Sequence, residues 1–175
     1  LASPRDEPLG VDLVLPDFTY LRERESMSRG VVLTHGHEDH IGAVPFLMRE
    51  VKIPVIVATR LTLGLVKSKL DEHGLLRASE LREVHPDDPP RELGPFQIGF
   101  VRMAHSIPDA VAIVLETPAG RIVHTGDYKL DHTPVDGLKT DVGKLAELGN
   151  RGVDLLLGDS TNAERPGFTP SERIV

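Results

Sequence analysis

The sequence predicts an α/β protein whose sheets are mixed rather than built from a strict alternation of strand and helix. Short β-branched apolar runs recur between turn signals, and helical patterns are fewer and interspersed among them. Several of the runs are almost entirely apolar, which is typical of strands that are covered on both faces. These observations together favour sheets with helices packed against them.

Individual elements follow from local patterns. Strands are expected over residues 30–35, 53–59, 96–103, 110–117, 121–125 and 153–157. Helices are expected over residues 41–50, over 61–73 with Gly74 closing the helix, and over 142–148 with Gly149 closing it. The Thr-Pro-Ala-Gly sequence at 117–120 predicts a hairpin turn, and the proline-rich stretch 84–95 predicts a loop.

Composition excludes several classes of protein. The 175 residues suit one domain, and the absence of cysteine rules out disulfides, thiolate zinc sites and cysteine nucleophiles. Twenty Lys and Arg against 27 Asp and Glu give a net charge of 20 − 27 = −7, which is not the basic footprint of a typical nucleic-acid binder. Bound divalent metals would add positive charge that this count leaves out, so RNA remains a possible partner.

The chain carries no targeting or membrane signal. No apolar run approaches the ~18–20 residues that span a bilayer, and the N-terminus lacks the layout of a signal peptide. We therefore expect a cytoplasmic protein that does not bind membranes. The first residue is Leu1 rather than Met, so we also expect the sequence to be an internal piece of a longer protein.

A histidine cluster separates the first predicted strand from the first predicted helix. Residues 34–40 read Thr-His-Gly-His-Glu-Asp-His, so four potential metal ligands fall within six positions. His35 and His37 should project to one side because side chains alternate along a strand, and Gly36 permits a tight turn between them. Asp39 and His40 should lie on the first turn of the helix and face the same cleft. Each pair could hold one metal ion; the alternative is a solvated polar turn, which three histidines and an aspartate do not favour.

Two further potential ligands each follow a predicted strand. His105 lies just past 96–103 and Asp127 just past 121–125. Strand ends are common places for reactive groups, although both residues also fit ordinary loop positions. With the cluster they would supply another imidazole and a carboxylate able to bridge two ions. Imidazole and carboxylate ligands with open positions indicate a catalytic metal site, suited to zinc or manganese.

These residues carry a family resemblance. Residues 34–40 resemble the His-x-His-x-Asp-His signature of the metallo-β-lactamase superfamily, with His105 and Asp127 where its next ligands belong. More closely, the chain resembles the ribonuclease J family of bacterial metallo-β-lactamase/β-CASP nucleases over nearly its whole length. The matching stretches are GVDLVLPDFTYL (10–21), THGHEDHIGAVPFL (34–47), LTLGLVKSKLDEHGL (61–75), HSIPDAVAIVLETPAG (105–120), HTGDYKLD (124–131) and GDSTNAERPGFTPSE (158–172).

The resemblance implies an incomplete αββα sandwich that binds two divalent metal ions, with zinc expected and manganese as the alternative. It implies hydrolysis of RNA phosphodiesters in 5′-to-3′ exonucleolytic and endonucleolytic modes, with the 5′ end of single-stranded RNA as partner and a homo-oligomeric full-length protein. It assigns one metal to His35, His37 and His105, the other to Asp39 and His40, and the bridging position to Asp127. Asp39 is also expected to be catalytic, by orienting or deprotonating the attacking water.

Four further residues are candidates for contacting the substrate or supporting the metal ligands. Ser106 and Ser160 could donate hydrogen bonds to a phosphate, although both also fit turn-capping roles. His124 lies within a predicted strand, where supporting a metal ligand by a hydrogen bond or packing in the strand is favoured over binding the metal itself. Asp159 follows another predicted strand and could orient a ligand histidine or cap a turn.

The family pattern contains more than these 175 residues. An N-terminal pair of strands with an Asp-x-Gly element, the β-CASP domain and a late histidine ligand of the second metal do not appear in the sequence. We therefore expect residues 1–175 to be part of a metallo-β-lactamase domain that has little or no nuclease activity alone. The alternatives are a small-ester hydrolase, such as a thioesterase or lactonase, and an inactive interaction module.

Overall fold

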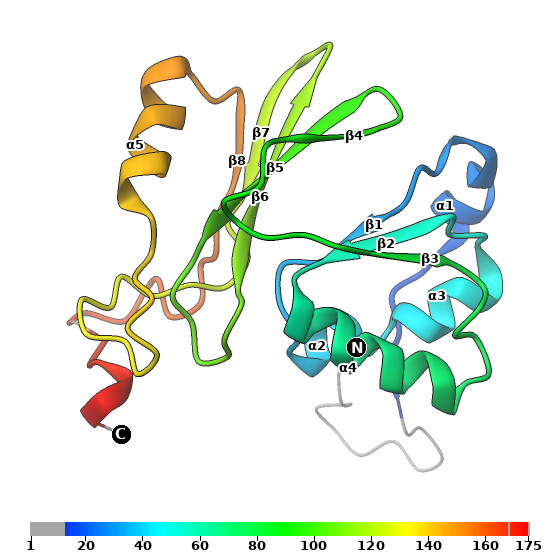
Figure 1. Cartoon of the computed structure of the whole chain (residues 1–175), viewed down its shortest axis with the longest axis horizontal. Coiled ribbons are helices and arrows are strands. Elements are labelled where there is room, and N and C mark those ends of the chain that lie inside the picture. Colours follow the sequence, from blue (N-terminus) through cyan, green and yellow to red (C-terminus); the bar gives the residue numbers. More distant parts are fainter. Residues whose placement is uncertain (1–12, 168, 175) are drawn as a thin grey trace. The chain divides into compact units, whose positions relative to one another are not determined.

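The computed structural model describes residues 13–167 and 169–174, so the first three residues of the stretch 10–21 and Phe168 lie outside it. Its contacts divide the chain into two compact units with the boundary between Glu83 and Val84. Each unit has its own sheet and helices, which confirms the predicted α/β class (Figure 1).

Unit 1 is a parallel sheet with helices in its connections. The sheet has the order β1-β2-β3, made of β1 (Val31–Val32), β2 (Val55–Ala58) and β3 (Glu80–Glu83), all parallel. The helices are α1 (Thr19–Arg22), the 3₁₀ turn η1 (Glu25–Met27), α2 (Glu38–Ile41), α3 (Val44–Glu50) and α4 (Arg60–Glu72). α2 to α4 lie along one face of the sheet (Figure 1), where Leu63, Val66 and Leu70 of α4 join Ile56 and Ala58 of β2 in one buried cluster.

Unit 1 differs from the sequence prediction in four ways. Its sheet is strictly parallel rather than mixed, and its strands are shorter than predicted. β3 was not predicted because its Glu-Leu-Arg-Glu sequence has no apolar run. The helix predicted over 41–50 is two helices, because Pro45 near the start of α3 would clash with the carbonyl of Ile41 inside a continuous helix.

Unit 2 is the mixed sheet that the sequence predicts. Its order is β4-β5-β6-β7-β8, formed by β4 (Arg91–Leu93), β5 (Phe96–Arg102), β6 (Val111–Thr117), β7 (Gly120–His124) and β8 (Leu155–Leu157). β4 to β7 are antiparallel, and β8 runs parallel to β7 after the crossover through α5 (Val142–Arg151). Leu148 of α5 packs against Val101, Ala112, Val114 and Val123 of the sheet, and the 3₁₀ turn η2 (Glu172–Ile174) follows later.

The turns of unit 2 confirm one prediction and correct another. Residues 117–120 form the predicted hairpin turn, with Thr117 opposite Gly120. The stretch 84–95 is not entirely a loop, because β4 lies within it. Gly94 (φ 61°) makes a tight turn into β5, which a glycine at the first central position of a hairpin turn allows.

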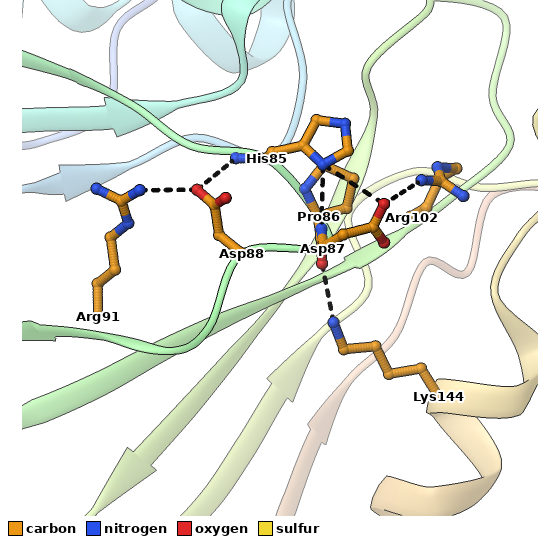
Figure 2. Close-up of polar contacts among 7 residues, drawn as sticks. All are labelled: His85, Pro86, Asp87, Asp88, Arg91, Arg102 and Lys144. Carbon is orange, nitrogen blue, oxygen red and sulfur yellow. Dashed lines mark hydrogen bonds and ion pairs between the residues drawn. The ribbon is translucent and has the colours of Figure 1, made fainter.

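A polar network holds the segment before β4 in place (Figure 2). An Asp87 carboxylate oxygen lies 3.0 Å from Arg102 Nη2 at the end of β5. Lys144 Nζ of α5 donates to the Pro86 carbonyl at 2.8 Å. The 85–88 segment is thus tied both to a strand and to the helix that covers the sheet.

Within the part of the chain that the structure describes, no helix is long and apolar enough to cross a membrane.

Candidate metal centre

Three histidine side chains of the cluster lie together in unit 1. β1 ends at Val32, so His35 lies in the following loop, His37 is the N-cap of α2, and His40 lies within α2. The ring of His35 has its centroid 4.8 Å from that of His37 and 4.0 Å from that of His40. The prediction that Asp39 and His40 lie on the first turn of a helix is confirmed, since both belong to α2.

Two neighbours constrain this histidine group. The hydroxyl of the buried Thr34 shares a hydrogen bond of 3.1 Å with Nδ1 of His35, whose side chain is fully buried. A carboxylate oxygen of the exposed Asp39 lies 3.5 Å from Nε2 of His40. Thr34 was not singled out from the sequence, because a threonine before a histidine carries no distinctive signal.

Unit 2 brings the other two predicted ligands together. His105 follows β5 and Asp127 follows β7, and His105 Nε2 lies 3.8 Å from Asp127 Oδ2. Both side chains are half-buried. The strands that carry them are not neighbours, because β6 lies between them in the sheet. The two loops meet instead through an antiparallel bridge of Ala104 and Lys129, in which Lys129 N donates to the Ala104 carbonyl at 2.7 Å.

The further candidates lie at or just past the ends of β5, β7 and β8 (Leu155–Leu157). His124 is exposed, and its Nδ1 accepts a hydrogen bond from Gly126 N at 3.0 Å, so it supports the turn that leads to Asp127. Asp159 is half-buried, and its carboxylate accepts from Thr161 N at 2.8 Å, which is the capping geometry that the sequence left open. Ser106 and Ser160 are both exposed.

The pKa of Asp159 lies below its usual value. Burial raises this pKa, but hydrogen bonds from Thr161 and from the Tyr128 backbone, together with the nearby His105, lower it by more. The carboxylate is therefore ionised at neutral pH and adds negative charge near His105.

A cavity opens beside His105 in unit 2. Its volume is about 410 Å³, and its lining includes His105, Ser106 and Ile107 after β5 and Val135 and Leu138 from the loop before α5. A small molecule or one unit of a polymer could enter a space of this size.

The donor set fits a divalent metal. Two ligand atoms bound to one zinc ion at about 2.0–2.2 Å can lie up to roughly 4 Å apart. Both the 3.5 Å separation of Asp39 and His40 and the 3.8 Å separation of His105 and Asp127 fall within that limit. Imidazole nitrogens and carboxylate oxygens without sulfur suit zinc or manganese.

The chain belongs to the metallo-β-lactamase superfamily, whose family pattern matches residues 10–160. Among curated proteins it is similar to one named Ribonuclease J from Synechocystis, with 47% identity over the whole chain and 27% of that protein. Another protein named Ribonuclease J, from Thermus thermophilus, is 50% identical over 98% of the chain and 31% of its own length. The chain therefore spans between a quarter and a third of the length of these relatives.

A solved structure shows the same fold. It is a protein of unknown function from Enterococcus faecalis V583, aligned over 82% of this chain and 34% of its own length, with a TM-score of 0.53 and 19% identity. At that identity the likeness supports the fold and nothing more.

Proposed function

We propose that this chain is part of the catalytic domain of a metal-dependent ribonuclease that hydrolyses RNA phosphodiesters. The observation that carries the proposal is the 44–50% identity to proteins named Ribonuclease J, which extends over nearly all of the chain rather than over the metal motif alone. A small-ester hydrolase of the superfamily would need to share only the ligands.

In this proposal the ligands of unit 1 and unit 2 complete one centre for two metal ions. One ion is assigned to His35, His37 and His105, and the second to Asp39 and His40, with Asp127 bridging. The close imidazole rings of unit 1 and the His105–Asp127 pair of unit 2 support the assignment. Zinc is the expected metal and manganese the alternative, because both accept imidazole and carboxylate ligands.

Metal ions in such a centre supply Lewis-acid chemistry, which lowers the pKa of a bound water and offsets charge on phosphoryl oxygens. The protein's own residues have separate tasks. Thr34 holds the ring of His35 through Nδ1, so that Nε2 is the nitrogen assigned to the metal. The exposed carboxylate of Asp39 can orient the attacking water and accept its proton. Ser106, at the cavity beside His105, can donate a hydrogen bond to a phosphate oxygen.

The parent protein is proposed to contain more than this segment. Residues 1–175 would form part of its metallo-β-lactamase domain, with N-terminal strands and a β-CASP domain elsewhere in the polypeptide. Its partner would be single-stranded RNA recognised at the 5′ end, and it would act in the cytoplasm as a homo-oligomer. The share of each relative that the chain covers, 27% and 31%, leaves room for these parts.

Digestion of end-labelled RNA by the full-length protein tests the proposal. Activity should require zinc or manganese, disappear with a chelator, and fall at least a hundredfold in His37→Ala, because a lost ligand weakens the metal site. His132→Ala is the matched control, since His132 is an exposed histidine outside both the proposed ligand set and the cavity lining, and its replacement should leave activity within twofold. Turnover of thioesters or lactones without RNA cleavage would instead support the small-ester hydrolase.

A further inference from the structure

Thr140 lies at the junction of the two segments that carry His105 and Asp127. Its hydroxyl accepts a hydrogen bond from Ala104 N at 2.9 Å and donates one to the Lys129 carbonyl at 3.1 Å. Ala104 directly precedes His105, and Lys129 is two residues past Asp127. The Thr140 side chain is buried, with 7% of the residue exposed, so water does not readily replace these bonds.

The sheet alone does not bring these segments together. β5 and β7 lie on opposite sides of β6, and strands two positions apart in a sheet are about 9–10 Å apart. His105 and Asp127 nevertheless approach to 3.8 Å, in the segments that follow these two strands. The isolated bridge between Ala104 and Lys129 links the two segments, and the Thr140 hydroxyl adds a second link between the same two residues.

Thr140 is itself held by the start of α5. The next residue, Asp141, donates its backbone N–H to the Arg102 carbonyl at 3.0 Å and caps α5 by accepting from Lys144 N at 2.9 Å. Lys144 reaches the Pro86 carbonyl, and Arg102 is paired with Asp87 (Figure 2). The end of β5 is therefore held by a hydrogen bond from the start of α5 and by an ion pair with the 85–88 segment.

We propose that Thr140 is a positioning residue of the metal centre, which sets the distance between His105 and Asp127. The inference rests on the proposed function only in taking these two residues as ligands of shared metal ions. Residues that orient metal ligands commonly change metal affinity 10–100-fold when they are replaced. Thr140 orients the ligands through hydrogen bonds to the backbone of the ligand-bearing loops rather than by contacting a ligand side chain.

The test compares three variants of the full-length protein. Thr140→Val keeps the shape of the side chain but removes the hydroxyl, and Thr140→Ser keeps the hydroxyl. The matched control is Thr117→Val, because the Thr117 hydroxyl also bonds a backbone carbonyl, that of Gly120 at 2.8 Å, but at the opposite end of β6 and β7. Zinc affinity is measured by competition with a chromogenic chelator, and the Co²⁺-substituted proteins are compared by visible absorption.

We expect Thr140→Val to bind zinc at least tenfold more weakly and to shift the Co²⁺ spectrum, with Thr140→Ser within about twofold of the parent in affinity. Thr117→Val should lower the melting temperature without either change. If Thr140→Val fails to melt cooperatively, Thr140→Ala removes the same hydroxyl and takes its place in the comparison. Zinc affinity in the hydroxyl-free variant within twofold of the parent, or an equal loss in Thr117→Val, would overturn the inference.

The same measurements separate this inference from the proposed function. A protein that binds zinc and responds to Thr140→Val but does not cleave RNA would retain the positioning role and lose the ribonuclease assignment. A protein that cleaves RNA but whose zinc affinity is unchanged by Thr140→Val would retain the ribonuclease assignment and lose the positioning role.

Discussion

Asp88 accepts hydrogen bonds from two groups through one carboxylate oxygen. Its Oδ2 atom accepts hydrogen bonds from His85 N at 3.1 Å and from Arg91 Nη2 at 2.8 Å (Figure 2). The pKa of Asp88 lies below its usual value, because the hydrogen bond from the His85 backbone lowers it most, burial raises it by less, and Arg91 lowers it further. The ionised form is therefore the one that stabilises the folded segment before β4.

Replacing Asp88 should make the free energy of unfolding less dependent on pH in the acidic range. A group whose folded pKa is lowered adds stability above its unfolded pKa of about 3.9, and that stability is lost as the pH falls through the folded value. We expect Asp88→Asn to lower the free energy of unfolding at pH 7 and to match the parent near pH 2. Urea unfolding across this range measures the effect, with the exposed Glu164→Gln as control. A difference that is as large at pH 2 as at pH 7 would contradict the assignment.

Two glycines show how one residue type acts differently in a helix and in a hairpin. Gly64 is exposed in α4, and an added methyl group would meet nothing within 4 Å. Gly120 begins β7 with φ at 139°, and an added Cβ would lie 2.5 Å from Asp154 Oδ2, which accepts the hydrogen bond of Arg121 N. The helix therefore tolerates a side chain where the hairpin does not.

Alanine substitution at the two glycines should change stability in opposite directions. Gly64→Ala should raise the free energy of unfolding by about 0.5–1 kcal/mol, since alanine restricts the unfolded chain and favours helix. Gly120→Ala should lower it by about 1–3 kcal/mol, because the backbone conformation is strained for an L residue and the carboxylate of Asp154 must move. Equilibrium denaturation of both variants measures the two changes. A loss of stability in Gly64→Ala would contradict the placement of Gly64 at an open position of α4.

In the whole molecule, the edge of the unit 2 sheet is apolar and exposed. The β8 residues Leu155, Leu156 and Leu157 are 47%, 63% and 45% exposed, and among the described residues β8 pairs with β7 alone. An exposed apolar edge strand invites pairing with another chain.

This edge should make the 175-residue chain self-associate. Leu156→Lys should reduce association, because lysine on an edge strand opposes pairing. Leu130→Lys is the control, since Leu130 is 62% exposed but lies in a loop. Sedimentation velocity at several concentrations measures the outcome, and equal effects of the two substitutions would show that the edge is not the cause.

The chain of 175 residues should also have little or no nuclease activity when it is separated from its parent. In the proposed centre, Asp39 and His40 bind the second metal alone, and Asp127 is shared between the two metals. With so few ligands of its own, the second metal ion should be held weakly. RNA digestion with added zinc or manganese compares the segment with the full-length protein at equal concentration. Comparable turnover would show that the remaining polypeptide is not needed for the chemistry.

Prediction from the sequence succeeded where a residue pattern and its structural cause lie close together along the chain. The apolar runs around Val55 and Val111 became β2 and β6, and the stop at Gly74 agrees with the end of α4. It failed for β3 and β4, whose charged sequences pair only because neighbouring strands offer them free edges. It also failed at Pro45, where the chain breaks a helix that the apolar pattern would continue.

The sequence by itself determined the chemistry of the candidate site. Four histidines and two aspartates without cysteine define a nitrogen and oxygen donor set, and the short spacing in residues 34–40 places four of them within one turn and helix start. Only the tertiary structure decided how His105 and Asp127 meet, since their strands are separated by β6. That contact depends on a bridge between two loops and on a buried hydroxyl from Thr140, 36 residues after Ala104, and interactions so distant along the chain leave no local pattern.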